Sequence, residues 1–157
     1  MNKGMKGWPK PPVFGTTQLF STVAQSIANG SSFVAVTFGS VTIGKFANQL
    51  RNGIVVPVDG LYTLAAIGGY AANATGQRDV EFLITRPNGP TVTAGRGTFP
   101  GDTTFDTYMM ALTEYVLRTG WVVSLQTRQD SGGALNLNAS AYLSVSLVHR
   151  IGATTRQ

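Results

Sequence analysis

The chain alternates apolar and polar residues in short runs between residue 31 and residue 151. The runs are rich in Val, Ile, Thr, Phe and Tyr and are separated by Gly, Asn or Pro, which is the spacing of strands in an all-β sandwich. Alternation gives a strand one face for a core, as where Val80, Phe82 and Ile84 alternate with Glu81 and Leu83. We predict strands at 32–38, 41–46, 53–58, 61–70, 79–86, 91–97, 105–118, 121–128 and 140–151, about the eight or nine that a jelly roll requires.

The last run and the turns fit the same antiparallel arrangement. Leu143, Val145 and Leu147 alternate with Ser144 and Ser146, which again provides one apolar face. Residues that favour tight turns stand between the predicted strands at 58–60 (VDG), 87–90 (PNGP) and 131–133 (SGG).

The first 30 residues have a different composition. Residues 1–15 hold several Gly and Pro residues around Trp8 and Phe14, which predicts an extended arm rather than a helix or a central strand. Within 16–29, helical spacing of apolar residues before an Asn-Gly pair predicts a short helix over 17–28, and the Thr and Ser content favours an irregular strand nearly as much. The predicted organisation is an arm at 1–30, a jelly-roll domain at 31–152 and a tail at 153–157.

The arm carries the residues that we expect to attach the protein to a larger structure. Trp8 and Phe14 are costly to leave in water. Lys3, Lys6 and Lys10 make the same segment basic. We expect the arm to dock on a neighbouring subunit or a larger assembly. The alternative is that its two aromatic residues fold back on their own domain.

Composition indicates a single domain with a weakly charged surface. A chain of 157 residues and 16.6 kDa has the usual size of one domain. Only 12% of its residues are charged, against about 25% in typical soluble domains, so part of the surface is expected to be hidden in an oligomer. The net charge of +5 does not favour nucleic acid, because the arginines are scattered singly from Arg51 to Arg156. Docking of the basic arm on an acidic protein surface fits that charge better.

Several classes of protein are not favoured. The chain has no cysteine, so disulfides and thiolate metal sites are absent. The first residues lack the apolar segment of an export signal. No apolar run approaches the roughly 18 residues that a membrane helix needs. We therefore expect a soluble protein that does not insert into membranes.

Few residues suit catalysis. His149 is the only histidine, and no Gly-x-Ser-x-Gly elbow is present, so neither a histidine zinc site within one chain nor a serine hydrolase is favoured. Asp79 and Glu81 share one strand face and offer a carboxylate pair, but Arg78 and Arg86 nearby favour a surface ion pair. We expect no enzymatic activity, no cofactor and no metal.

Two further patterns have simple structural interpretations. Asp102 and Asp106 lie in an oxygen-rich loop that offers ligands to Ca²⁺, but without the EF-hand spacing we favour a solvated turn. The pair at 68–69, together with Gly95 and Gly97, precedes no predicted helix that would hold a phosphate. We interpret these glycines as turns and bulges.

Three segments resemble the C1q/TNF-like family of trimeric jelly rolls. Residues 53–62 (GIVVPVDGLY) look like the family's strand, turn and Gly-x-Tyr entry into the next strand. Residues 115–125 (YVLRTGWVVSL) are similar to its apolar strand, Gly-Asp turn and alternating strand, although Trp121 replaces the Asp. Residues 142–147 (YLSVSL) resemble its closing strand. The resemblance covers about residues 32–151 and implies a homotrimer.

The resemblance also implies which strands line a threefold axis. These are the strand that ends at Leu117 and the last strand, so Met110 and Tyr142 are the candidate residues of the trimer interface. A physical reason supports the choice: Tyr108, Met109 and Met110 form an unbroken apolar run, and an apolar outer face of a sheet needs a partner surface.

The missing collagen stalk and the missing cysteines favour a viral or bacterial member of this family. We expect a non-enzymatic virion structural protein that is assembled in the host cytoplasm. It would be a trimeric capsid decoration, head-fibre or tail-associated module, anchored on capsid or tail proteins by its arm. The alternative is a carbohydrate- or receptor-binding lectin-like domain, in which loops at 71–78 and 98–105 contact a ligand such as a host-surface glycan.

Overall fold

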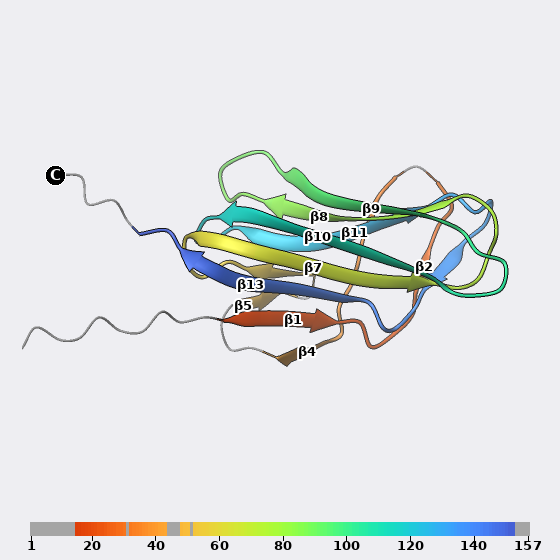
Figure 1. Cartoon of the computed structure of the whole chain (residues 1–157), viewed down its shortest axis with the longest axis horizontal. Helices are drawn as coiled ribbons and strands as arrows, with labels where there is room; N and C mark the ends of the chain where they lie inside the picture. The colour runs from red at the N-terminus through yellow and green to blue at the C-terminus, as the bar shows by residue number, and fades with distance from the viewer. Residues whose placement is uncertain (1–14, 31, 44–47, 51, 153–157) are drawn as a thin grey trace, which may run out of the picture.

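Two antiparallel β-sheets pack face to face in a computed structural model of the chain (Figure 1). The structure describes residues 15–30, 32–43, 48–50 and 52–152, and within these ranges every regular element is a strand. None of the described elements is a helix that is able to span a membrane. The all-β antiparallel jelly-roll sandwich predicted from the sequence is confirmed. Outside the described residues lie Lys3, Lys6, Trp8, Lys10, Phe14 and the predicted tail at 153–157.

The first sheet contains seven strands in the order β2-β12-β7-β13-β1-β4, and β10 also pairs with β7. The long strands β7, β10 and β13 form most of its surface (Figure 1). Its strands are β1 Thr16–Phe20, β2 Gln25–Ile27, β4 Ser40–Ile43, β7 Gly60–Tyr70, β10 Thr107–Leu117, β12 Leu135–Leu137 and β13 Tyr142–Arg150.

The second sheet contains six strands in the order β5-β6-β11-β8-β9, and β3 also pairs with β11. Its centre is the pair β8 and β11, which is hydrogen-bonded from Thr85 opposite Val122 to Arg78 opposite Gln129. The strands are β3 Val34–Ala35, β5 Asn48–Leu50, β6 Gly53–Val55, β8 Gln77–Thr85, β9 Val92–Pro100 and β11 Val122–Gln129.

The short helix predicted over 17–28 is wrong, and the strand alternative is the one that forms. Residues 16–20 are strand β1 and residues 25–27 are strand β2. Tertiary pairing overrides the helical spacing, because β1 is hydrogen-bonded along β13 with Leu19 opposite Leu143. The predicted arm boundary at residue 30 is therefore wrong as well, since the sandwich already includes residues 16–30.

The core lies between the sheets and follows the alternation read from the sequence. On β13, Leu143, Val145 and Leu147 are buried, as predicted. Gly60 was expected to permit a turn, but its role is close packing: a Cβ at this position would stand 2.6 Å from the backbone oxygen of His149 on β13. Tyr62 is fully buried, and its hydroxyl donates a hydrogen bond to the backbone oxygen of Val58 over 2.7 Å.

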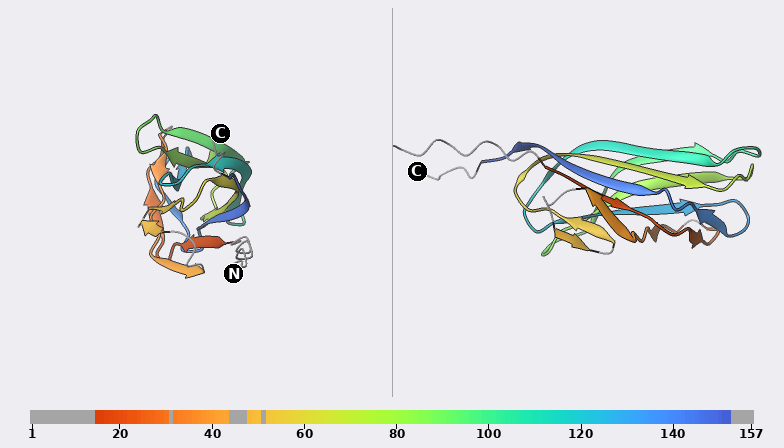
Figure 2. Two further views of the ribbon diagram at one scale, coloured as in Figure 1. Left: turned by 90° about the vertical axis from the view of Figure 1, so that its left-hand side faces the viewer. Right: turned by 90° about the horizontal axis from the view of Figure 1, so that it is seen from below.

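The sandwich has two distinct ends (Figure 2). Strand β1 begins and strand β13 ends at one of them, which we call the terminal end. The opposite end, which we call the distal end, carries the connections at 71–76, 101–106 and 130–134. The loops that the lectin alternative invokes therefore lie at the distal end, away from the two ends of the described chain.

Candidate functional site

The outer face of the first sheet is apolar along β10. Side chains at every second position of this strand are turned away from the core: Tyr108 is 58% exposed, Met110 59%, Leu112 65% and Val116 43%. A strand with one face in water usually carries polar side chains on that face. These four side chains instead expose large apolar surfaces. Met109 lies between Tyr108 and Met110 and is buried in the core. The apolar run 108–110 therefore contributes side chains to both faces of the sheet.

The apolar surface continues across the neighbouring strands. Met110 lies opposite Ile67 on β7, and Ile67 lies opposite Tyr142 on β13. Tyr142 in turn lies opposite Phe20 on β1, and the two rings are stacked with centroids 5.7 Å apart. The two residues predicted for the trimer interface thus share one row across the sheet, on either side of Ile67. We call Phe20, Ile67, Met110, Leu112 and Tyr142 the apolar face.

Polar side chains replace apolar ones toward the terminal end of the same sheet. One row places Glu114 opposite Thr63, and Thr63 opposite Ser146. Thr16 on β1 lies opposite Ser146 and their hydroxyl oxygens are 2.9 Å apart. This row separates the apolar face from Val116, so the exposed apolar surface is concentrated in the distal half of the sheet.

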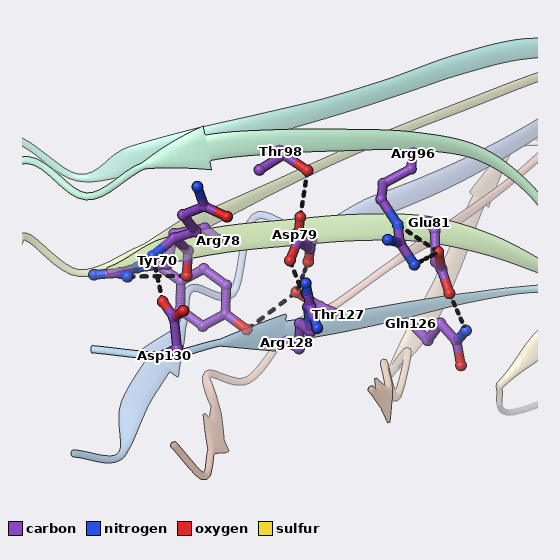
Figure 3. Close-up of polar contacts among 11 residues, drawn as sticks. Tyr70, Arg78, Asp79, Glu81, Arg96, Thr98, Gln126, Thr127, Arg128 and Asp130 are labelled. Carbon is purple, nitrogen blue, oxygen red and sulfur yellow. Dashed lines mark hydrogen bonds and ion pairs between the residues drawn. The ribbon is translucent and has the colours of Figure 1, made fainter. Parts of the chain in front are cut away.

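The outer face of the second sheet is charged, in contrast (Figure 3). Asp79 is buried to 2% exposure although it points away from the core. Its Oδ2 pairs with the Nε of Arg128 at 2.5 Å, and its Oδ1 accepts a hydrogen bond from the hydroxyl of Thr98. These partners come from β11 and β9, the two strands that flank β8.

Glu81 is held in the same way two residues further along β8 (Figure 3). Its Oε2 accepts hydrogen bonds from the Nε and Nη2 of Arg96 at 2.7 and 2.5 Å, and its Oε1 accepts one from the Nε2 of Gln126 at 2.6 Å. Phe33 lies beneath both cations, with its ring centre 4.8 Å from the guanidinium carbon of Arg96 and 5.1 Å from that of Arg128. Both carboxylates are fully engaged, so they do not form a free acid-base pair.

The ion pairing of Asp79 and Glu81 was predicted, but its predicted partners are wrong. Arg78 points into the distal end of the core, where its guanidinium donates to the backbone oxygens of residues 73, 75 and 77 and lies 5.9 Å from the centre of the Tyr70 ring. Arg86 stacks over Trp121 at 4.8 Å. Sequence proximity is misleading here, because flanking strands rather than flanking residues supply the cations.

Comparison with known proteins supports the fold at low sequence identity. No protein-family model matches the chain, and no curated protein matches it in sequence. Eiger TNF from S. frugiperda superposes with a TM-score of 0.70 at 8% identity, over 92% of this chain and 98% of its own. Murine APRIL at pH 5.0 gives 0.68 at 11% identity, over 87% and 100%. The globular domain of zebrafish complement 1qA gives 0.63 at 13%, over 87% and 99%. The fold is a C1q/TNF-like jelly roll.

Within this C1q/TNF-like jelly roll, the candidate metal and catalytic residues do not converge. Among the described residues, no group of three or more His, Asp or Glu side chains is placed to hold a metal ion. The Oδ1 of Asp102 accepts hydrogen bonds from the backbone N–H groups of Thr104 and Phe105, which hold the pKa of this carboxyl below its usual range. The Oδ2 of Asp106 instead accepts a hydrogen bond from the Nδ2 of Asn138. Residues 102–106 form an exposed turn that the side chain of Asp102 stabilises.

The glycines singled out in the sequence have individual roles. Gly95 adopts a left-handed φ of 56° where the pairing of β8 with β9 shifts register, so it is a bulge, as predicted. The pair Gly68–Gly69 is wrongly interpreted as a turn, because both residues lie inside β7. The ring of Tyr108 packs against Gly69.

The sequence pointed to Met110 and Tyr142 but missed three members of the apolar face. Phe20 lies inside the segment predicted as a short helix over 17–28, and Ile67 and Leu112 were not singled out from the sequence. The signal that could have found them is the alternation of side chains between the two faces of a strand. Because Met109 and Ala111 point into the core, Met110 and Leu112 must point outward. His149, near the end of β13, is exposed.

Proposed function

We propose that the chain is a non-enzymatic structural protein of a virion, a homotrimeric module that decorates a capsid or belongs to a head fibre or tail. Its jelly roll projects from the particle, and the basic N-terminal arm attaches it to a capsid or tail protein. The apolar face is the observation that carries the proposal. It spans β1, β13, β7 and β10, and a second copy of the same chain is the partner to which every subunit always has access.

Burial of the apolar face supplies the driving force for association. Leu112 and Met110 alone expose 65% and 59% of their surfaces. Removal of apolar surface from water is worth about 25 cal/mol per Å². The face is also poor in charge, so its burial requires little desolvation of ionised groups. The number of subunits, three, follows from the resemblance to C1q/TNF-like jelly rolls.

The arrangement of the ends supports attachment by the arm. Strand β1 begins at the terminal end, so the preceding segment, which includes Lys3, Lys6, Trp8, Lys10 and Phe14, is connected to the sandwich there. The loops of the distal end are then directed away from the attachment point (Figure 2). Three arms side by side in a trimer would bring nine lysines to one surface, which favours an acidic docking site.

The proposal is tested on particles purified from the source. We expect mass spectrometry to find the chain at a copy number that is a multiple of three, and the full-length protein to bind particles that have been stripped of it. A variant without residues 1–14 should remain folded and lose this binding. A matched control exchanges Lys3, Lys6 and Lys10 for Arg and should bind normally. Absence of the chain from purified particles would refute the virion role.

A further inference from the structure

At the distal end of the first sheet, β10, β7 and β12 bring three side chains together. Tyr108 on β10 lies opposite Gly69 on β7. The backbone N–H of Asn138 donates to the backbone oxygen of Gly69 over 2.7 Å, which anchors the residue after β12 beside the same position. Asp106 is the residue before β10. Asp106 and Tyr108 thus come from one segment and Asn138 from another about 30 residues later, and Tyr108 and Asn138 both lie beside Gly69.

Gly69 leaves room for the ring of Tyr108 to lie on the sheet. A Cβ at position 69 would be 2.9 Å from the Cε1 of Tyr108 and 3.4 Å from the Nδ2 of Asn138, so the ring and the amide are neighbours. The ring nevertheless remains 58% exposed. An aromatic ring supported from below and open to solvent is a platform on which the apolar face of a ligand can stack.

Beside this platform stands a hydrogen-bonded pair of a carboxylate and an amide. The Nδ2 of Asn138 donates to the Oδ2 of Asp106 over 2.7 Å. This contact uses one of the two amide hydrogens and one of the two carboxylate oxygens, so the pair still offers one donor and several acceptor positions. Asn138 is half-buried and tied by its own backbone, which limits the ordering that a ligand would require.

We propose that Tyr108, Asp106 and Asn138 form a binding subsite for one neutral pyranose ring of a glycan. A pyranose has an apolar face of C–H groups, which stacks on Tyr108, and an edge of adjacent hydroxyl groups. One hydroxyl donates to the carboxylate of Asp106 and its neighbour accepts from the amide of Asn138, so each polar group meets its complement. Asp102 in the same loop adds negative charge, which disfavours acidic sugars.

The subsite lies within one protomer, so it does not depend on the trimer. The subsite would allow the distal end to bind a ligand. The proposed function concerns only the terminal end, where the arm attaches the protein to a particle. A shallow site with few contacts predicts a weak dissociation constant, on the order of 1 mM for one protomer. Three copies in one trimer would strengthen binding to a clustered glycan through avidity.

The full chain is to be titrated with the neutral methyl glycosides of glucose, galactose, mannose and N-acetylglucosamine, with saturation-transfer NMR as the readout. We expect at least one glycoside to bind. Asn138→Asp should weaken that binding about tenfold or more, because it removes the donor and places a second carboxylate beside Asp106. The control is Asn136→Asp, which makes the same exchange two residues earlier at an exposed position of β12 and should bind like the unaltered chain.

Two further variants separate stacking from folding. Tyr108→Ala should abolish binding and Tyr108→Phe should retain it, with the thermal midpoint and the molar mass of both variants unchanged. The subsite proposal is overturned if none of the four glycosides binds, if Asn136→Asp and Asn138→Asp behave alike, or if Tyr108→Ala changes the molar mass, which would place Tyr108 in a subunit interface. None of these results bears on whether the chain occurs in particles, so the two proposals fail independently.

Discussion

Tyr62 and Tyr70 on β7 place two phenolic hydroxyls inside the sandwich. Both side chains are fully buried, and burial raises the pKa of each to about 12 from an ordinary value of 10.0. The hydroxyls keep partners there: Tyr62 donates to the backbone oxygen of Val58, and the hydroxyl oxygen of Tyr70 lies 3.1 Å from that of Thr127. The neutral phenol suits these positions and the phenolate does not, since it would be desolvated.

The protein should therefore lose stability in alkali. Below about pH 10 both tyrosines are neutral in the folded and the unfolded chain. Between about pH 10 and pH 12 the unfolded chain releases these protons while the folded chain retains them, so the free energy of unfolding decreases as the pH rises. Urea unfolding across this range measures the slope. Tyr70→Phe should make the slope shallower, and an unchanged slope in that variant would show that Tyr70 is not the group responsible.

For single residues, the sequence predicted which side chains are buried better than it predicted which side chains interact with one another. The core positions of the last strand, Leu143, Val145 and Leu147, were predicted from alternation and are buried. The partners of Asp79 and Glu81 were not found, because Arg128 and Arg96 reach them across strands whose register no local pattern encodes. Arg78 is entirely buried although most arginines are exposed, because carbonyl oxygens of the loop that precedes it accept hydrogen bonds from both of its Nη atoms.

Among the strands, β10 shows most clearly a division between a buried side and an exposed apolar side. Its inner side chains complete the core and its outer side chains form part of the apolar face. The element was predicted from the sequence at 105–118 and is found at Thr107–Leu117. Alternation is strong in a strand of eleven residues, whereas three-residue strands such as β5 and β12 carry too few positions to show a period and were missed. Asn138 of the proposed glycan subsite follows β12 and was missed with it.

A charge placed on the outer side of β10 tests the apolar face. Leu112→Glu should raise the concentration at which the chains associate by about 100-fold or more, because every interface would bury an unpaired carboxylate. Folding should be preserved, since Leu112 is 65% exposed and lies outside the core. Thr85→Glu makes a comparable exchange at an exposed position of β8 in the other sheet and should associate normally. Sedimentation velocity compares the two, and equal association of both variants would exclude the face from the interface.

The molecule as a whole combines a charged sheet with an apolar one. The outer face of the second sheet satisfies its own ionised groups through Asp79 and Glu81, so it is complete in a single chain. The outer face of the first sheet leaves Phe20, Ile67, Met110, Leu112 and Tyr142 without a covering layer among the described residues. This asymmetry is the reason for assigning the proposed subunit interface to the first sheet.

The fold class could be predicted from the sequence because alternation, turn residues and three short family-like segments agreed. The apolar face could be predicted only in part. Met110 and Tyr142 lie 32 positions apart in sequence and share a row only through the pairing of β10 with β7 and of β7 with β13. Phe20 joins that row through β1, which the helical spacing concealed. Long-range register is a property of the folded sheet, so it had to come from the structure.

The central claim, that the apolar face joins three chains, is tested most directly by the molar mass of the unaltered chain in solution. Size exclusion coupled to light scattering, over a range of micromolar concentrations, should give three times the 16.6 kDa of one chain. A constant mass of 16.6 kDa throughout that range would contradict the account, because the apolar face would then remain exposed to water in the functional protein.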